Sequence, residues 1–116
     1  MDKQELIIQG ERKKDVYLLR LQGDITKPSG EELLRWVDWE KGLPDQLPRL
    51  VLDLSSVPYI NSAGIAYLIR LVRLGQEGGF ETSCFGVSYH YEKLFQMVGL
   101  TRWLTICPSE WAAMGE

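Results

Sequence analysis

The segment from Leu50 to Leu71 constrains the fold of this chain most, because it predicts a strand and a helix joined by a few polar residues. Its first part, LVLDLSSVPYI, is apolar and is bounded by two serines and a proline, which is typical of a buried strand. After Asn61, apolar residues recur with the period of an amphipathic helix. Ser62 therefore lies at a helix start, where unpaired N–H groups and a partial positive charge favour a hydroxyl cap or an anion such as phosphate.

The rest of the chain predicts strands that alternate with helices. Leu6–Gln9 and Val16–Leu21 are expected to form an antiparallel hairpin around the polar turn GERKKD. The other expected elements are a helix opened by a capping box at Pro28, Ser29 and Glu32 and running to about Lys41, a strand over 81–86, a helix capped by Ser88 and ended by Gly99, a strand over 103–106, and a short helix opened by Pro108 and Ser109.

This order predicts one α/β domain over residues 1–116, with a mixed sheet of about five strands and about four helices. The leading hairpin makes the first strand pair antiparallel, and right-handed crossovers make the later strands parallel. Trp36 and Trp39 are three residues apart in the first expected helix, so they share one face of that helix and are expected to pack into the core. The alternative is that an exposed tryptophan there marks a second contact surface.

Charge and hydropathy exclude several classes of function. The net charge is −3, and the cations are scattered among acids, which argues against a nucleic-acid partner. Uninterrupted apolar runs such as Ile65–Ile69 are far shorter than the roughly 20 residues of a membrane span, so we expect no membrane insertion. The N-terminal sequence is too polar and acidic for a signal peptide, and a cytoplasmic location is therefore expected.

Few residues could carry chemistry. His90 is the single histidine, so metal ligation and a serine–histidine triad both lack parts, and we expect neither a cofactor nor an enzyme. Cys84 and Cys107 fit no metal motif and are expected to be buried thiols. Asp53, near the end of a buried strand, superficially matches the phosphoacceptor of a response-regulator receiver, but the chain lacks the acidic pair and the lysine that such a site needs.

Several segments together resemble the STAS domain, the module shared by bacterial anti-sigma factor antagonists and the cytosolic tails of sulfate transporters. The resemblance covers nearly the whole chain and rests on the GDI turn at 23–25, the strand LVLDLSSV, the helix start NSAGIAYLIRL, the double glycine at 78–79 and the segment EKLFQMVGLTRWLTI. In the antagonists, a serine that follows an acidic residue at this helix start is phosphorylated, and Ser62 occupies the matching position.

This resemblance implies a cycle of partner exchange. The unphosphorylated protein would bind an anti-sigma factor that has serine kinase activity and so free a sigma factor. The phosphorylated protein would dissociate until a PP2C-type phosphatase restored it. The alternatives are that Ser62 only caps its helix, or that the chain is a non-phosphorylated scaffold or accessory subunit of a stressosome-like or lipid-transport ABC complex. The chain departs from the antagonist pattern at Asn61, where an aspartate is usual, and at Thr26, where another acid is usual.

The expected partner-binding surface combines the helix start with the turn beside it. Small residues at Ala63 and Gly64 are expected to let a partner backbone approach closely, and Ile65 is expected either there or in the core. The full set is Asp24, Ile25, Thr26, Lys27, Asn61, Ser62, Ala63, Gly64, Ile65 and Ala66.

Overall fold

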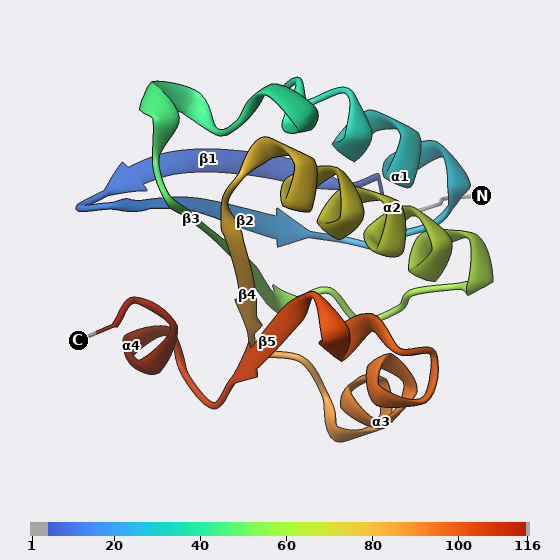
Figure 1. Ribbon diagram of the computed structural model, residues 1–116. Helices are drawn as coiled ribbons and strands as arrows, with labels where there is room; N and C mark the ends of the chain where they lie inside the picture. Colours follow the sequence, from blue (N-terminus) through green and yellow to red (C-terminus); the bar gives the residue numbers. More distant parts are fainter. Residues whose placement is uncertain (1–4, 116) are drawn as a thin grey trace.

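The computed structural model describes residues 5–115, in which strands and helices alternate after a leading hairpin (Figure 1). The strands are β1 (Ile7–Lys13), β2 (Val16–Gln22), β3 (Arg49–Ser56), β4 (Glu81–Phe85) and β5 (Leu104–Cys107). The helices are α1 (Lys27–Leu34), α2 (Ser62–Gly78), α3 (Tyr89–Met97) and α4 (Glu110–Ala113), with short 3-10 turns at Trp39–Lys41, Pro44–Gln46 and Leu100–Arg102.

The five strands form one mixed sheet in the order β1-β2-β3-β4-β5. β1 pairs antiparallel with β2, and the pairs β2–β3, β3–β4 and β4–β5 are parallel, which confirms the predicted arrangement. The expected turn was too long, since residues 10–13 belong to β1 and only Lys14 and Asp15 turn. Charged residues on an exposed edge strand protect that edge from pairing, and from sequence they are easily mistaken for a turn.

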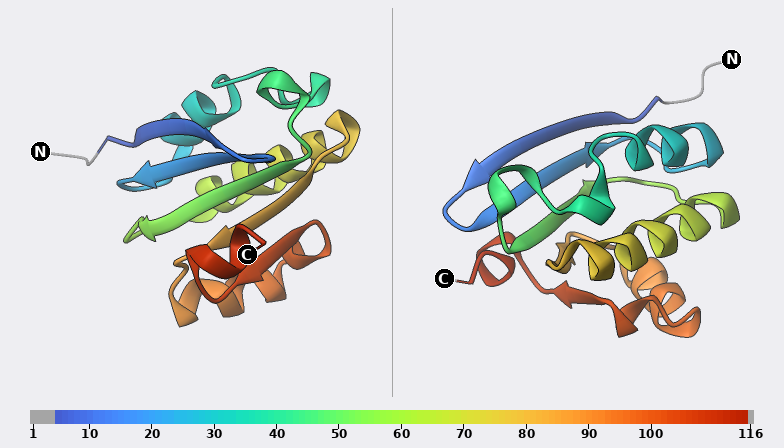
Figure 2. Two further views of the ribbon diagram at one scale, coloured as in Figure 1. Left: turned by 90° about the vertical axis from the view of Figure 1, so that its left-hand side faces the viewer. Right: turned by 45° about the horizontal axis from the view of Figure 1, so that its top comes forward.

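The strand residues alternate between two hydrophobic clusters of unequal size. Leu19, Leu50 and Leu52 belong to the larger cluster, to which α1, α2 and α3 contribute Leu33, Leu68 and Phe95. The smaller cluster on the opposite face contains Val16, Leu18, Val51 and Phe85 beneath Ala113 and Met114 at α4. Figure 2 shows α1 and α2 on one side of the sheet and α4 on the other. Within residues 5–115, no helix combines the length and the apolar composition that crossing a bilayer requires.

Helix α1 differs from its prediction at both ends. Thr26 is the N-cap residue and Ser29 is the third helical residue, whose Oγ accepts from the Thr26 N–H at 2.7 Å, so Ser29 is not the cap. The helix ends at Leu34 rather than near Lys41. Its last turn is interrupted because the Leu33 carbonyl accepts from the Trp36 N–H and the indole Nε1–H of Trp39, both at 3.1 Å, instead of continuing the helix.

The two tryptophans consequently do not share a helical face, and the expectation that both pack into the core was wrong. Trp39 is 1% exposed and lies in the larger core cluster. Trp36 is 40% exposed and its indole N–H donates to the Tyr17 hydroxyl at 2.9 Å. Burying one indole therefore ended the helix that the sequence pattern would have continued.

Candidate functional site

The loops that follow β2 and β3 lie side by side at the carboxyl edge of the sheet. Parallel strands end at the same edge, and here the two loops also pair through an isolated bridge between Ile25 and Ile60. The Ile25 N–H donates to the Tyr59 carbonyl at 3.0 Å, and the Asn61 N–H donates to the Ile25 carbonyl at 3.2 Å. The turn at 24–27 is thereby fixed beside the start of α2, as the sequence predicted.

Asn61, not Ser62, caps helix α2. The Asn61 backbone is extended, and its Oδ1 accepts from the Gly64 N–H at 2.8 Å. Ser62 is the first helical residue, and its side chain is exposed. Within residues 5–115, the Ser62 hydroxyl has no hydrogen-bond partner. The structure therefore contradicts the alternative that Ser62 serves only as the cap of α2.

Replacing Asn61 with alanine tests this assignment. The substitution removes the acceptor of the Gly64 N–H, so we expect the free energy of unfolding to fall by about 1 kcal/mol, as for other N-cap losses. Ser62→Ala is the matched control and is expected to stay within about 0.5 kcal/mol of the natural protein. Urea unfolding followed by circular dichroism measures both, and an equal loss in the two variants would contradict the assignment.

Two residues expected to contact a partner, Ile25 and Gly64, lie in the interior instead, and Ile65 follows the core alternative. Ile25 is 0% exposed and Ile65 is 7% exposed, and both belong to the larger core cluster. Gly64 is buried, and a Cβ placed there would lie 2.1 Å from the Ile25 carbonyl oxygen. The small residue at 64 thus allows α2 to approach the neighbouring loop of its own chain, so the expected reason for Gly64 was wrong.

The remaining expected residues reach the surface to different extents. Lys27, Ser62 and Ala66 are exposed, whereas Asp24, Thr26, Asn61 and Ala63 are half-buried. We call these seven residues the Ser62 surface. They bring the hydroxyl groups of Thr26 and Ser62, one ammonium group and one carboxylate to the carboxyl edge of the sheet.

Beside the Ser62 surface lies a groove that the sequence did not predict. It has a volume of about 470 Å³ and runs between the start of α2 and helix α3. The Ile60 N–H donates to the Tyr91 hydroxyl at 2.9 Å, which ties α3 to the loop before Ser62. Tyr59 is 50% exposed and Val98 is 42% exposed. The residues that line this α2–α3 groove are Tyr59, Ile60, Asn61, Ser62, Ile65, His90, Tyr91, Leu94 and Val98.

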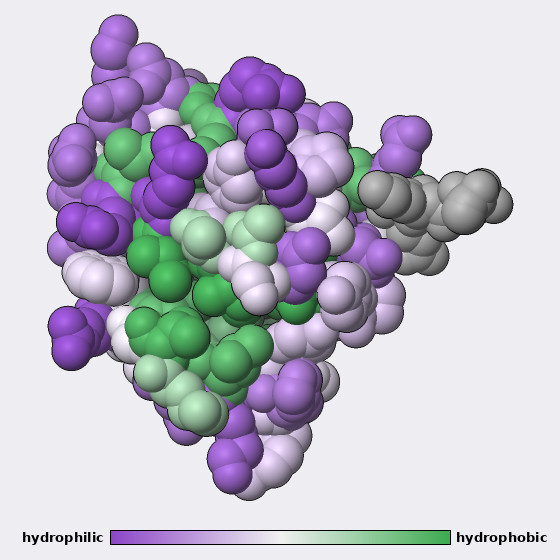
Figure 3. Space-filling model, turned by 90° about the vertical axis from the view of Figure 1, so that its right-hand side faces the viewer, coloured by the Kyte–Doolittle hydropathy of each residue, from purple (hydrophilic) through white to green (hydrophobic). Residues whose placement is uncertain are grey.

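The character of the α2–α3 groove is apolar. None of its lining residues is an acid, a lysine or an arginine. Figure 3 shows this side of the molecule, with hydrophobic side chains gathered near the centre and hydrophilic ones around them. The sequence signal that points to this groove is the apolar face of α3 formed by Tyr91, Leu94, Phe95 and Val98, of which only Phe95 is fully buried. The apolar face of α3 therefore serves the core and the surface together.

Asp53, the other candidate phosphoacceptor, is already engaged. Its carboxylate accepts from Arg20 at 2.8 Å and from the Ser55 N–H at 3.0 Å, and it also accepts from the Ser55 hydroxyl. Burial alone would raise the pKa of Asp53, but these hydrogen bonds outweigh it and hold the pKa below its ordinary value of 3.8. Arg20 also donates to both carboxylate oxygens of Glu110, at 3.1 and 3.0 Å. Asp53 is therefore part of an ion-pair network that joins the sheet to α4.

The histidine and the cysteines form no second site. His90 is exposed at the start of α3. Both are free thiols, but only Cys84 is buried as expected; Cys107 is half-buried, so the expectation was wrong for that residue. Burial raises the pKa of the Cys84 thiol to about 12, so this thiol stays protonated at neutral pH. Residues 5–115 contain no group of three or more histidine, cysteine or acidic side chains placed to hold a metal ion.

Known proteins share this architecture. An anti-sigma factor antagonist from Mycobacterium paratuberculosis is 22% identical, with 96% of this chain and 92% of that chain covered at a TM-score of 0.76. The protein TM1081 of Thermotoga maritima is 18% identical, with 95% and 87% covered and a TM-score of 0.78. Bacillus SpoIIAA in its phosphorylated form is 17% identical, with 94% and 97% covered and a TM-score of 0.69.

The family assignment follows from the sequence match as well as from the fold. The sequence model of the STAS domain family matches residues 8–113, which is nearly the whole chain. The match includes all five strands apart from Ile7, the first residue of β1. At these identities, the solved structures establish that the fold is shared. The chain belongs to the STAS domain family.

Proposed function

We propose that this protein is a phosphorylation-switched binding protein of the anti-sigma factor antagonist type. Unphosphorylated, it would bind an anti-sigma factor with serine kinase activity in the cytoplasm and so release a sigma factor for transcription. A PP2C-type phosphatase would reverse the modification. The observation that carries the proposal is the Ser62 hydroxyl, which is exposed at the start of α2 while Asn61 performs the capping.

The surroundings of Ser62 support binding rather than catalysis. Ser62 lines one end of the apolar α2–α3 groove, and Lys27 and Ala66 lie exposed on the Ser62 surface. A partner that covers this groove would remove water from Tyr59, Leu94 and Val98, which is a favourable contribution to association. Within residues 5–115, no hydrogen bond joins Ser62 to His90, the histidine that lines the same groove, and Asp53 belongs to the ion-pair network with Arg20, so no activated nucleophile is assembled here.

A phosphate on Ser62 would weaken the binding of a partner to the α2–α3 groove without unfolding the domain. It adds about −1.5 to −2 charges beside the apolar groove, and docking a partner would then require removing water from a dianion. The helix start tolerates the same group, because the N-terminal end of a helix favours an anion by about 0.3 to 1 kcal/mol. The first turn of α2 contains no acidic residue that would repel it. The modification would thus act on binding.

Incubation with the partner anti-sigma factor and ATP, followed by mass spectrometry, tests the proposal. We expect one phosphate on Ser62 and none on the Ser62→Ala variant, which should still bind the partner. Phosphate on Thr26, Ser55 or Ser56 instead would contradict the assignment. Partner binding without any labelling would favour the alternative of a non-phosphorylated scaffold or accessory subunit.

A further inference from the structure

Helices α1 and α2 begin side by side. The isolated bridge described above joins the two loops in parallel, and the N-cap residues Thr26 and Asn61 each follow it by one position. The first helical residues are therefore Lys27 of α1 and Ser62 of α2, each two positions beyond the bridge. In Figure 1, α2 lies between α1 and α3, and Lys27 is not among the residues that line the α2–α3 groove. Lys27 thus has the same place on α1 that Ser62 has on α2.

The two helices stay in contact beyond their first residues. A Cβ placed at Gly30 of α1 would lie 2.6 Å from the Tyr67 ring of α2, and the Tyr67 hydroxyl donates to Glu31 at 3.3 Å. The axes of packed helices are about 8 to 10 Å apart. The flexible four-carbon stem of a lysine and the phosphate ester of a serine are together long enough to span that distance. A phosphate on Ser62 would therefore be within reach of the Lys27 ammonium group.

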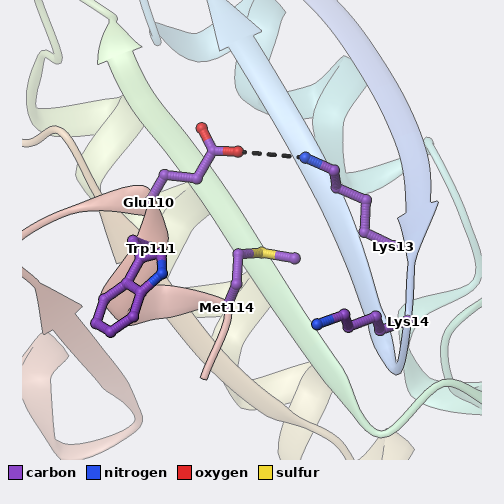
Figure 4. Close-up of a pocket in the computed structure, with 5 residues that line it drawn as sticks. All are labelled: Lys13, Lys14, Glu110, Trp111 and Met114. Carbon is purple, nitrogen blue, oxygen red and sulfur yellow. Dashed lines mark ion pairs between the residues drawn. The ribbon is translucent and has the colours of Figure 1, made fainter. Parts of the chain in front are cut away.

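The ammonium group of Lys27 is available for such a contact. Within residues 5–115, Lys27 forms no ion pair, side-chain hydrogen bond or ring contact. Lys13, by contrast, pairs with Glu110 at 3.5 Å (Figure 4). Glu31 is one turn further along α1 than Lys27, but it accepts from the Tyr67 hydroxyl instead. The exposed Lys27 side chain is therefore not committed to an acid of its own chain within the described residues.

The charges around this position favour an added anion. The first turns of α1 and α2 contain no acidic residue, and the N-cap residues of both helices are neutral. The ionisable groups beside Lys27 and Ser62 are Asp24, which is half-buried in the turn before α1, and His90, which is exposed on α3 across the groove. Lys27 is the only lysine or arginine among the seven residues of the Ser62 surface.

We propose that the Lys27 ammonium group forms an ion pair with the phosphate once Ser62 is phosphorylated. The inference rests on the proposed function in one respect, namely that Ser62 is the modified residue. A nearby cation favours the doubly charged form of a phosphate, so the modified protein carries about −2 charges at Ser62 at neutral pH rather than about −1.5. The pair also withdraws the Lys27 ammonium group from a protein that docks at the Ser62 surface. Lys27 is thus a positioning residue that makes the switch more complete.

Phosphorus nuclear magnetic resonance of the full-length protein with phosphoserine at position 62 tests this. The phosphoserine is incorporated during translation, so neither a kinase nor an anti-sigma factor enters the measurement. We expect the second pKa of the phosphate to be about 0.4 pH units lower with Lys27 than in the Lys27→Gln variant, which is the size expected from an exposed ion pair. The Hε resonances of Lys27 should shift with the same midpoint as the phosphate. Lys27→Arg keeps the charge and should keep the low pKa.

Lys93→Gln is the matched control, because it removes the same charge from another exposed lysine, whose ammonium group lies 5.3 Å from the centre of the Tyr89 ring on α3. It should leave the second pKa of the phosphate within about 0.1 pH units of the natural sequence. Equal pKa values with Lys27 and in Lys27→Gln, an equal rise in Lys93→Gln, or a Lys27→Arg variant that behaves like Lys27→Gln would each overturn the proposal. A failure of the proposed function is a separate result, since it shows as missing label on Ser62 after incubation with the anti-sigma factor and ATP.

Discussion

Replacing Gly64 with alanine is expected to lower the free energy of unfolding by about 2 to 3 kcal/mol, because the added methyl group overpacks a contact between backbones. The new Cβ would lie 2.1 Å from the Ile25 carbonyl oxygen and 3.0 Å from the Ile60 side chain. That carbonyl cannot retreat freely, since it accepts from the Asn61 N–H. Alanine gains up to about 1 kcal/mol of helix propensity over glycine, which is too little to offset the clash.

Thermal unfolding measures this effect, and a decrease of roughly 10 °C or more in Tm is expected for a domain of this size. Ser62→Ala is the control, because it lies two residues away on the exposed side of the same turn. It should change Tm by no more than a few degrees, since surface substitutions usually stay within about 0.5 kcal/mol. A Gly64→Ala variant as stable as the natural protein would contradict this prediction, because it would mean that α2 and the loop at Ile25 can move apart without a loss of folding stability.

If the proposed function is correct, phosphorylation of Ser62 is expected to weaken binding of the proposed partner, an anti-sigma factor, by a few hundredfold, equivalent to roughly 3 to 4 kcal/mol. Ser62→Asp carries one charge instead of nearly two and is expected to weaken binding by about tenfold or more. The physical reason is the apolar α2–α3 groove next to Ser62, whose lining contributes no lysine or arginine to compensate a charge. Isothermal titration calorimetry of the phosphorylated, Ser62→Asp and Ser62→Ala proteins gives the three affinities.

The fold is expected to remain intact in all of these proteins, because an acid at the first position of a helix is favoured by the helix dipole. Ser109→Asp is the matched control for charge, since Ser109 is an exposed serine at the start of α4 and aspartate also serves as an N-cap. It should bind the anti-sigma factor as tightly as the natural protein does. Undiminished binding by Ser62→Asp, or unfolding on phosphorylation, would be incompatible with a switch that acts on docking alone.

The strands and helices from β3 onward were predictable because each carries its own local signal. The apolar run LVLDLSSV, the helical period after Asn61 and the serine caps at Ser88 and Ser109 all agree with the structure. The end of α1 was not predictable from such signals. It depends on the Trp39 indole reaching the Leu33 carbonyl, a contact that exists only once the core has formed around Trp39.

The candidate site was predicted in position but not in detail. Asparagine and serine are both strong N-cap residues, so the sequence N-S could not say which one caps α2. Only the extended backbone at Asn61 decides it and leaves Ser62 exposed. Likewise, the sequence predicted that residues 24–27 and 61–66 lie together, but it did not predict which of them are exposed. Ile25 and Gly64 are buried because two loops that are far apart in sequence pair with each other.

The pairing of those two loops bears on the kinetics of association. The backbone before Ser62 is held from one side by Ile25 and from the other by Tyr91, so the loop keeps one conformation in the free protein. A protein that docks here therefore meets a rigid target and spends no conformational entropy on immobilising it. Substitutions or modifications at this edge should consequently alter how long a complex survives far more than how fast it forms.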